Sequence, residues 1–153
     1  MHRHGYKGRK FGRERDQRKA LMRGLMCSLV EYQAIETTLP KAKDLRPKME
    51  KVISKARKGD LSNRRRVIAA LSNIELGQLL VDKIAPQIKR DSGYLRVVKL
   101  DTNRVGDNAP MARIEFVDEI SLKETPTEEI KKSPKAEEKP APKVEGTVKK
   151  EDK

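Results

Sequence analysis

The side chains of this sequence that could carry chemistry are cationic, and the densest group of them lies at its start. Residues 1–19 hold eight lysines and arginines against Glu14 and Asp16, with glycines at positions 5, 8 and 12 and no hydrophobic period. Guanidinium groups pair bidentately with phosphate oxygens, and glycine allows tight bends. We therefore interpret this segment as a basic arm that threads between RNA helices. The alternative is a merely solvated chain end.

Two further groups of cations lie in segments with helical periodicity. The first is a lysine-rich face at positions 48, 51, 55, 57 and 58, and such a face is as often solvated as it is a binding surface. The second is the triplet Arg64, Arg65 and Arg66. Three consecutive residues span most of a helical circumference, so at least one arginine should reach RNA phosphates. The alternative is that the triplet forms ion pairs with Asp60 or Glu75.

One more cation, Arg104, lies in a turn-rich loop, DTNRVGDNAP. Gly106 and Asp107 favour a tight turn that could present Arg104 to RNA. Alternatively, Asp101 and Asp107 neutralise its charge.

Motifs of catalysis and metal binding are absent from the sequence. It contains no H-E-x-x-H, no G-x-S-x-G and no phosphate-binding loop ending in G-K-[ST]. Its one cysteine, Cys27, lies far from the only histidines, His2 and His4, so we expect Cys27 to be partly buried filler rather than a zinc ligand. We predict that the protein is not an enzyme and takes no cofactor, metal or small-molecule substrate.

The net charge of +13 predicts a polyanionic partner. Residues 1–117 hold 27 basic and 13 acidic residues, or +14, whereas residues 118–153 amount to −1. No apolar run approaches the roughly 18 residues of a membrane span, so nucleic acid in the cytosol is favoured over a membrane. The charge alone permits a nucleoid or regulatory DNA-binding protein, and an RNA-modifying enzyme is a more distant alternative.

Hydrophobic periodicity predicts the elements that position these cations. We expect helices over 18–32 with Asp16 as N-cap, over 40–57 with a kink or break near Asp44 caused by Pro47, and over 61–71 with Asp60 as N-cap. A fourth helix should begin at a capping box of Ser72 and Glu75 and end at Pro86. Strands are expected over 35–38, 94–100 and 111–117.

The predicted fold class is therefore α+β, a two-layer α/β sandwich of order α-β-α-α-α-β-β whose small mixed sheet is covered by helices. We divide the chain into the arm at 1–15, a globular domain at 16–117 and a Lys/Glu/Pro-rich tail at 118–153. The tail has too few large apolar residues to fold, so we predict disorder over 123–153. It is either a solubilising tail or a tether for another factor.

Four motifs in this order resemble the bacterial ribosomal protein L17 family. They are GRKFGR at 8–13, RKALMR at 18–23, IETTLPKAKDLRP at 35–47 and GDNAPMA at 106–112. The resemblance covers residues 1–117 and implies a two-layer α/β fold in the large ribosomal subunit. It also implies binding to 23S ribosomal RNA near the polypeptide exit tunnel, beside neighbouring large-subunit proteins.

The resemblance also implies which residues contact RNA. They are Arg3, Lys7, Arg9, Lys10, Arg13, Arg18, Lys19, Lys41, Lys43, Arg46 and Arg104. The sequence departs from the family pattern at residues 14–16, where small hydroxyl residues are usual, and in the long charged tail. Glu14 beside a phosphate would be repelled, which puts the path of the arm in doubt at that point.

Overall fold

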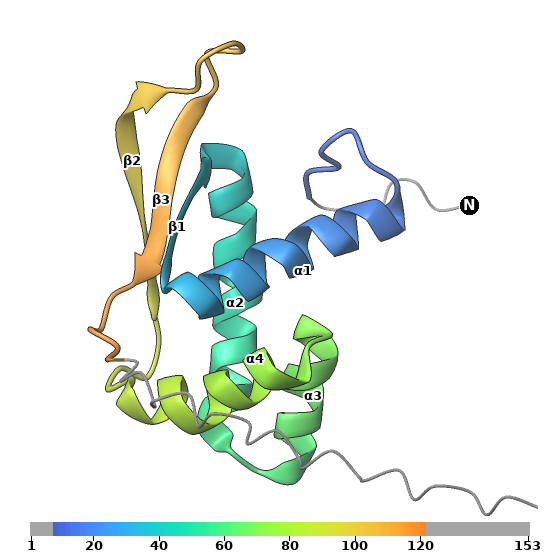
Figure 1. The fold of residues 1–153 in the computed structure, drawn as a ribbon, viewed down its shortest axis with the longest axis vertical. Helices are drawn as coiled ribbons and strands as arrows, with labels where there is room; N and C mark the ends of the chain where they lie inside the picture. Colours follow the sequence, from blue (N-terminus) through green and yellow to red (C-terminus); the bar gives the residue numbers. More distant parts are fainter. Residues whose placement is uncertain (1–7, 122–153) are drawn as a thin grey trace, which may run out of the picture. The chain divides into compact units, whose positions relative to one another are not determined.

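The structure is a computed structural model that describes residues 8–121 (Figure 1). Its elements are α1 (Arg15–Tyr32), β1 (Ala34–Thr38), α2 (Leu39–Lys58), α3 (Leu61–Leu71), α4 (Ile74–Gln78), a π-helix (Leu79–Ile84), a 3-10 helix (Ala85–Gln87), β2 (Leu95–Asn103) and β3 (Pro110–Phe116). The α+β class and the predicted order of the four helices and three strands are confirmed. The predicted disorder over 123–153 and the first seven residues of the arm lie outside the described residues.

Helix α1 begins earlier than its apolar pattern predicts. The backbone N–H of Arg18 donates to the carbonyl of Glu14 at 2.9 Å, so Glu14 is the N-cap and the prediction of Asp16 was wrong. Asp16 lies instead in the first turn, where its carboxylate faces the positive end of the helix dipole. The buried residues of the helix, Met22, Met26, Leu29 and Val30, recur at the spacing of one helical face.

Helix α2 runs without interruption through Pro47, so the predicted local break was wrong. Proline removes the backbone donor that would reach the carbonyl of Lys43. Both Pro47 and Lys43 are exposed, so water can reach the unpaired carbonyl and the helix continues. At its end Gly59 takes the left-handed conformation, with φ 69°.

The junction of α3 and α4 differs from the predicted capping box. Ser72 is the left-handed C-cap of α3, with φ 54°, and Asn73 is the N-cap of α4, accepting a hydrogen bond from the Leu76 N–H at 3.1 Å. Asp60 does occupy the N-cap position of α3. Its carboxylate, however, accepts from the Asn63 side chain rather than from the backbone.

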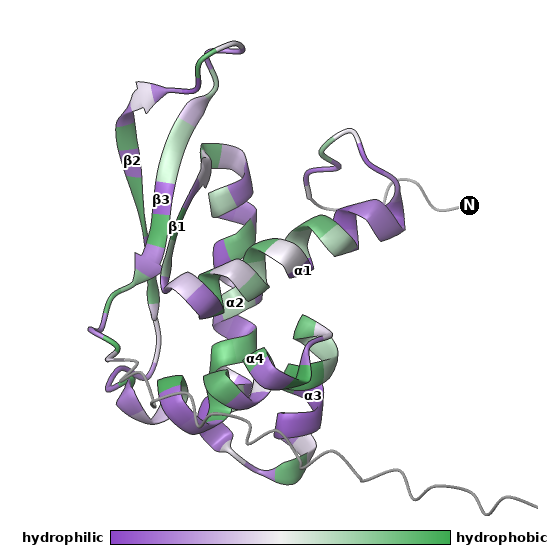
Figure 2. Ribbon diagram, viewed as in Figure 1, coloured by the Kyte–Doolittle hydropathy of each residue, from purple (hydrophilic) through white to green (hydrophobic). Residues whose placement is uncertain are grey.

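The sheet has the strand order β1-β3-β2, and both pairings are antiparallel, so the predicted mixed sheet was wrong in that respect. Ala112, Ile114 and Phe116 point from the central strand into the core, because alternate residues of a strand face the same side of the sheet. Figure 2 shows hydrophilic and hydrophobic segments alternating along β2 and β3. The helices lie on one side of the sheet, with α2 in contact with all three strands.

A single core joins the helices to the inner face of the sheet. Its largest fully buried side chains include Leu45, Met49, Ile53, Leu80 and Ile114. Beyond β3 the chain stays against this body: Ile120 is buried, and the Ser121 N–H donates to Gln87 Oε1 at 2.9 Å. Across the described range, the structure contains no helix long and apolar enough to span a membrane.

Candidate nucleic-acid interface

The outer side of α2 carries a row of lysines, Lys48, Lys51, Lys55 and Lys58, which we call the lysine row. Their spacing of three, four and three residues places them on one face of the helix, away from the buried residues. All four are exposed, and none forms an ion pair with another residue between 8 and 121. The row is thus a surface of uncompensated positive charge along about three helical turns.

The arginine triplet divides into one paired and two unpaired side chains. Arg64 donates to both carboxylate oxygens of Asp82, one of them at 3.1 Å, and not to Asp60 or Glu75 as the alternative had it. Arg65 and Arg66 are exposed and have no ion-pair partner within the described part of the chain. The triplet therefore presents two free guanidinium groups.

The described part of the arm folds back onto the start of α2. Arg9 donates to Asp44 Oδ1 at 2.8 Å and to the carbonyl of Pro40 at 3.4 Å. A turn with Phe11 and Gly12 in the left-handed region closes with a hydrogen bond from the Arg13 N–H to the Lys10 carbonyl at 3.2 Å. Residues 8–13 of the arm thus have a defined local conformation, while Arg9, Lys10 and Arg13 are exposed.

The other predicted RNA-contacting residues differ in whether an acid or a main-chain carbonyl binds their side chains. Lys10, Lys19 and Lys43 are exposed, Lys41 is half-buried, and none of them forms an ion pair with a residue in 8–121. Arg46 pairs with Glu50 at 3.1 Å. The remaining arginines donate to main-chain carbonyls, Arg13 to Phe11 and Arg18 to Arg13, while Arg3 and Lys7 lie outside the described residues.

Arg104 is held by its neighbour Asp107, as one of the two sequence interpretations proposed. The Arg104 Nε atom donates to Asp107 Oδ1 at 3.0 Å, and an Nη atom donates to the other carboxylate oxygen. The hydrogen bond from Arg104 lowers the pKa of Asp107 to about 2, so its carboxylate stays charged at neutral pH. The two charges offset each other at this position.

At the C-terminal end of α2, Arg57 makes tertiary contacts that the sequence did not indicate. Arg57 donates to Asp91 at 3.2 Å and to the Tyr94 hydroxyl at 3.3 Å, and its guanidinium lies 5.7 Å from the Tyr94 ring centroid. The hydrogen bond to Tyr94 raises the pKa of Arg57. Arg57, which the sequence had grouped with the four lysines, is therefore engaged by Asp91 and Tyr94 and is not part of the lysine row.

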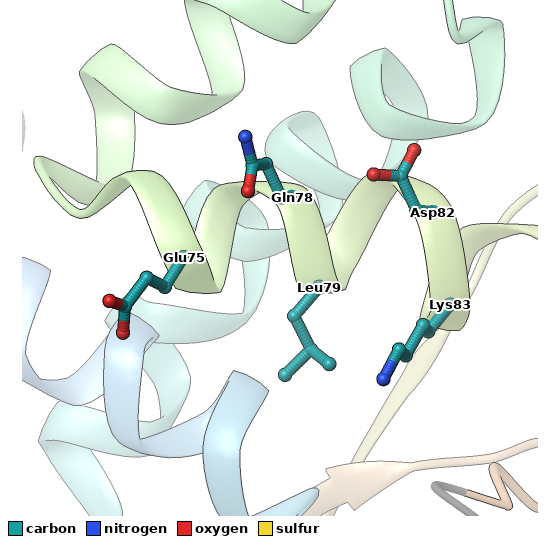
Figure 3. A pocket seen from close by; sticks show the side chains of 5 residues that line it. All are labelled: Glu75, Gln78, Leu79, Asp82 and Lys83. Atoms are coloured by element: carbon teal, nitrogen blue, oxygen red, sulfur yellow. The ribbon is translucent and has the colours of Figure 1, made fainter. Parts of the chain in front are cut away.

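The carboxylates near α4 do not form an acid–base pair. Figure 3 shows the pocket along α4 and the π-helix, where Gln78 and Asp82 point to one side and Glu75, Leu79 and Lys83 to the other. Asp82 is already bound to Arg64. In the described residues no group of three histidines, cysteines or acids is placed to hold a metal ion.

Cys27 is partly buried filler, as the sequence predicted. Its thiol donates to the carbonyl of Leu71 at 3.4 Å, and burial raises its pKa. A raised pKa keeps the thiol protonated and unreactive at neutral pH.

The sequence of this chain matches one family of known proteins. The family model described as ribosomal protein L17 matches residues 21–117. Large ribosomal subunit protein bL17 of Mesorhizobium japonicum is 51% identical over 117 residues, which cover 76% of this chain and 81% of that protein. The protein of the same name from Thermodesulfovibrio yellowstonii is 43% identical over 131 residues, which cover 85% of this chain and 98% of that protein.

Proposed function

Since the chain belongs to the ribosomal protein L17 family, we propose that it binds 23S ribosomal RNA near the rim of the polypeptide exit tunnel. Members of this family are structural and non-enzymatic components of the large subunit, so the chain is a protein of the cytoplasmic ribosome. The motif resemblance supports the tunnel location and the presence of neighbouring large-subunit proteins. The distribution of free charge supports RNA as the direct partner.

The observation that carries the proposal is that the lysine row and the pair Arg65 and Arg66 remain unpaired. Elsewhere Arg46, Arg64 and Arg104 form ion pairs with nearby acids, so paired cations are common on this surface. These six cations have no such partner in the described chain, and neither have Lys41 and Lys43 near the start of α2. Uncompensated Lys and Arg near each other repel, and phosphates relieve that repulsion while releasing counterions.

The arm and the central motif complete the proposed surface. Arg9 pairs with Asp44 while 49% of its side chain remains exposed, and an exposed ion pair of this kind contributes little free energy. A phosphate can therefore replace Asp44. The further proposed RNA contacts are Arg3, Lys7, Arg9, Lys10 and Arg13 in the arm, Arg18 and Lys19 in α1, and Lys41, Lys43 and Arg46 near the start of α2. Arg46 is included because its pair with Glu50 is also exposed, with 48% of the Arg46 side chain accessible.

The three-part division of the chain follows from the same proposal. Residues 1–15 act as the RNA-penetrating arm, residues 16–117 form the globular domain, and residues 118–153, with a net charge of −1, supply no attraction for RNA. Arg104 is left out of the RNA surface because two hydrogen bonds hold it to Asp107 and because Asp101 gives residues 101–110 a net charge of −1.

Chemical footprinting of large-subunit RNA with and without the full-length protein tests the proposal. We expect protected nucleotides to cluster around the tunnel rim. The same footprint should survive competition by duplex DNA of equal charge, because a nucleoid-type protein would be drawn off by DNA. Protection confined to another region of the subunit, or loss of the footprint to DNA, would reject the proposed function.

A further inference from the structure

The hairpin of β2 and β3 extends beyond the third strand of the sheet. β1 ends at Thr38, opposite Met111, whereas β2 and β3 continue to the pair Asn103 and Pro110. The hairpin projects past the start of α2 in Figure 1, and residues 101–108 are all exposed. We call residues 101–110 the hairpin tip. It adds nothing to the hydrophobic core, so packing of the fold does not explain it.

The hairpin tip nevertheless has a well-defined conformation. Arg104 and Asp107 are joined by their two side-chain hydrogen bonds, and the Arg104 N–H donates to the Ala109 carbonyl at 3.0 Å. Across the turn, the Asn103 side chain donates to Asn108 at 2.9 Å. A surface turn held by so many contacts loses little entropy on binding.

The residue displayed by this turn is apolar. Val105 is 99% exposed, the most exposed large hydrophobic side chain among the described residues. Isolated exposed apolar residues are ordinary on protein surfaces. Here the valine stands at the end of a projecting, preformed hairpin, where it can enter a cavity that a flat surface could not reach.

The charge around Val105 indicates the kind of cavity. Asp101, Arg104 and Asp107 are the charged residues of the hairpin tip, and they sum to −1 in a chain of net charge +13. Two donors of the Arg104 guanidinium, on Nε and on one Nη, bind Asp107, whose carboxylate stays ionised. A phosphate group would meet the carboxylates, whereas a lysine or arginine of another protein would be attracted to them.

We propose that the hairpin tip docks into a neighbouring basic protein of the large subunit, with Val105 in an apolar socket whose rim carries Lys or Arg side chains facing Asp101 and Asp107. This goes beyond the proposed RNA site and uses none of its residues. The tip and the lysine row then have separate partners.

Removing the negative charge of Asp101 tests whether the partner of the hairpin tip is a basic protein or RNA. Asp101 forms no ion pair or hydrogen bond with a side chain of the described chain, so Asp101→Asn changes the charge without releasing the turn. Purified large subunits that carry the full-length variant are washed at rising salt. We expect Asp101→Asn to be released at lower salt than the parent. Release at higher salt would indicate RNA at the tip, and unchanged release a solvated tip; either result rejects the proposal.

A second pair of variants tests the socket. Val105→Thr keeps the side-chain shape but brings a hydroxyl into the socket, and we expect roughly tenfold weaker retention with the same salt slope. Val98→Thr, on the outer face of the sheet and 45% exposed, is the matched control and should change retention far less. Equal effects at the two positions would reject the socket. Both variants should keep the unfolding midpoint of the parent.

A photo-cross-linking phenylalanine analogue at position 105 gives an independent readout. After RNase treatment of the irradiated subunits, we expect the adduct to join this chain to one basic protein. An adduct to RNA, or none, would overturn the proposal. The proposed RNA binding is tested separately, by footprinting and by the variants of Arg65 and Arg66. A negative result for the hairpin tip therefore does not contradict it.

Discussion

At the scale of the residue, the unpaired Arg65 and Arg66 can be compared with the neighbouring Arg64, whose side chain is paired. Replacing Arg65 and Arg66 by Gln removes two free cations, so we expect the slope of log affinity for ribosomal RNA against log salt to fall by about 0.7 to 0.9 for each lost phosphate contact. Arg64→Gln removes a cation that is bound to Asp82 and should leave the slope nearly unchanged. Filter binding over a salt series measures both. Equal slopes for all variants would assign the triplet to the protein surface alone.

Asp107 offers a test of the hairpin tip by pH. Its pKa is lowered from 3.8 to about 2, so the Arg104 contact stabilises the folded tip above pH 3.8 and is lost as the pH falls toward 2. An NMR titration of the Asp107 carboxyl carbon should show a midpoint near 2. Arg104→Gln should return the midpoint to the ordinary range. A normal midpoint in the parent would mean that the contact does not persist in solution.

At the scale of the element, replacing either of two helical glycines by alanine should change the free energy of unfolding in opposite directions. A Cβ at Gly77 would lie 2.7 Å from Ile68 Cγ1 and 3.2 Å from Ile68 Cα, so α3 and α4 would have to separate. We expect Gly77→Ala to lower the free energy of unfolding by about 1–3 kcal/mol. Gly24→Ala meets nothing within 4 Å and should raise it by about 0.5–1 kcal/mol. Urea unfolding followed by circular dichroism measures both changes, and a stabilised Gly77→Ala would contradict the close packing.

The elements were predictable from sequence, and their ends were less so. Apolar periodicity located α1 to α3 because the buried face sets the helix, but it does not say which polar residue caps it. Glu14 rather than Asp16, and Asn73 rather than Ser72, are the N-caps because the caps depend on where the preceding chain enters. The π-helix at Leu79–Ile84 carries no pattern that distinguishes it from an α-helix.

For the site, the sequence located the cations but not their partners. The pairing of Arg64 with Asp82 joins positions 18 residues apart, and that of Arg9 with Asp44 joins positions 35 apart. Such pairs depend on tertiary packing, which spacing does not encode. The lysine row was visible as helical spacing. Its freedom from acids became evident only once the acids of the other elements were placed.

At the scale of the whole molecule, the arm should contribute to binding and hardly to folding. Deleting residues 2–13 removes five predicted RNA contacts and the surface pair of Arg9 with Asp44, and residues 8–13 contribute no buried side chain. We expect a change in unfolding free energy within about 1 kcal/mol, because exposed ion pairs contribute no more. The truncated protein should wash off large subunits at much lower salt than the intact one.

Urea unfolding and salt washes of assembled subunits measure the two effects separately. An internal control is the double change Arg65→Gln and Arg66→Gln in the full chain, which keeps the arm. If the truncated and intact proteins are released at the same salt, RNA is held by the helices without the arm.

The position of β2 at the border of the sheet bears on the interval between synthesis and assembly. Within the described residues β2 pairs with β3 on one side and with no strand on the other. The open backbone of such an edge can pair with a second copy of the chain and begin aggregation. Lys99, which has no ion-pair partner in the described chain, interrupts the apolar residues between Leu95 and Leu100 and brings like charges together wherever two such edges approach, whereas Arg96 is paired with Glu115. This repulsion disfavours strand pairing between two copies of the chain that have not yet been assembled.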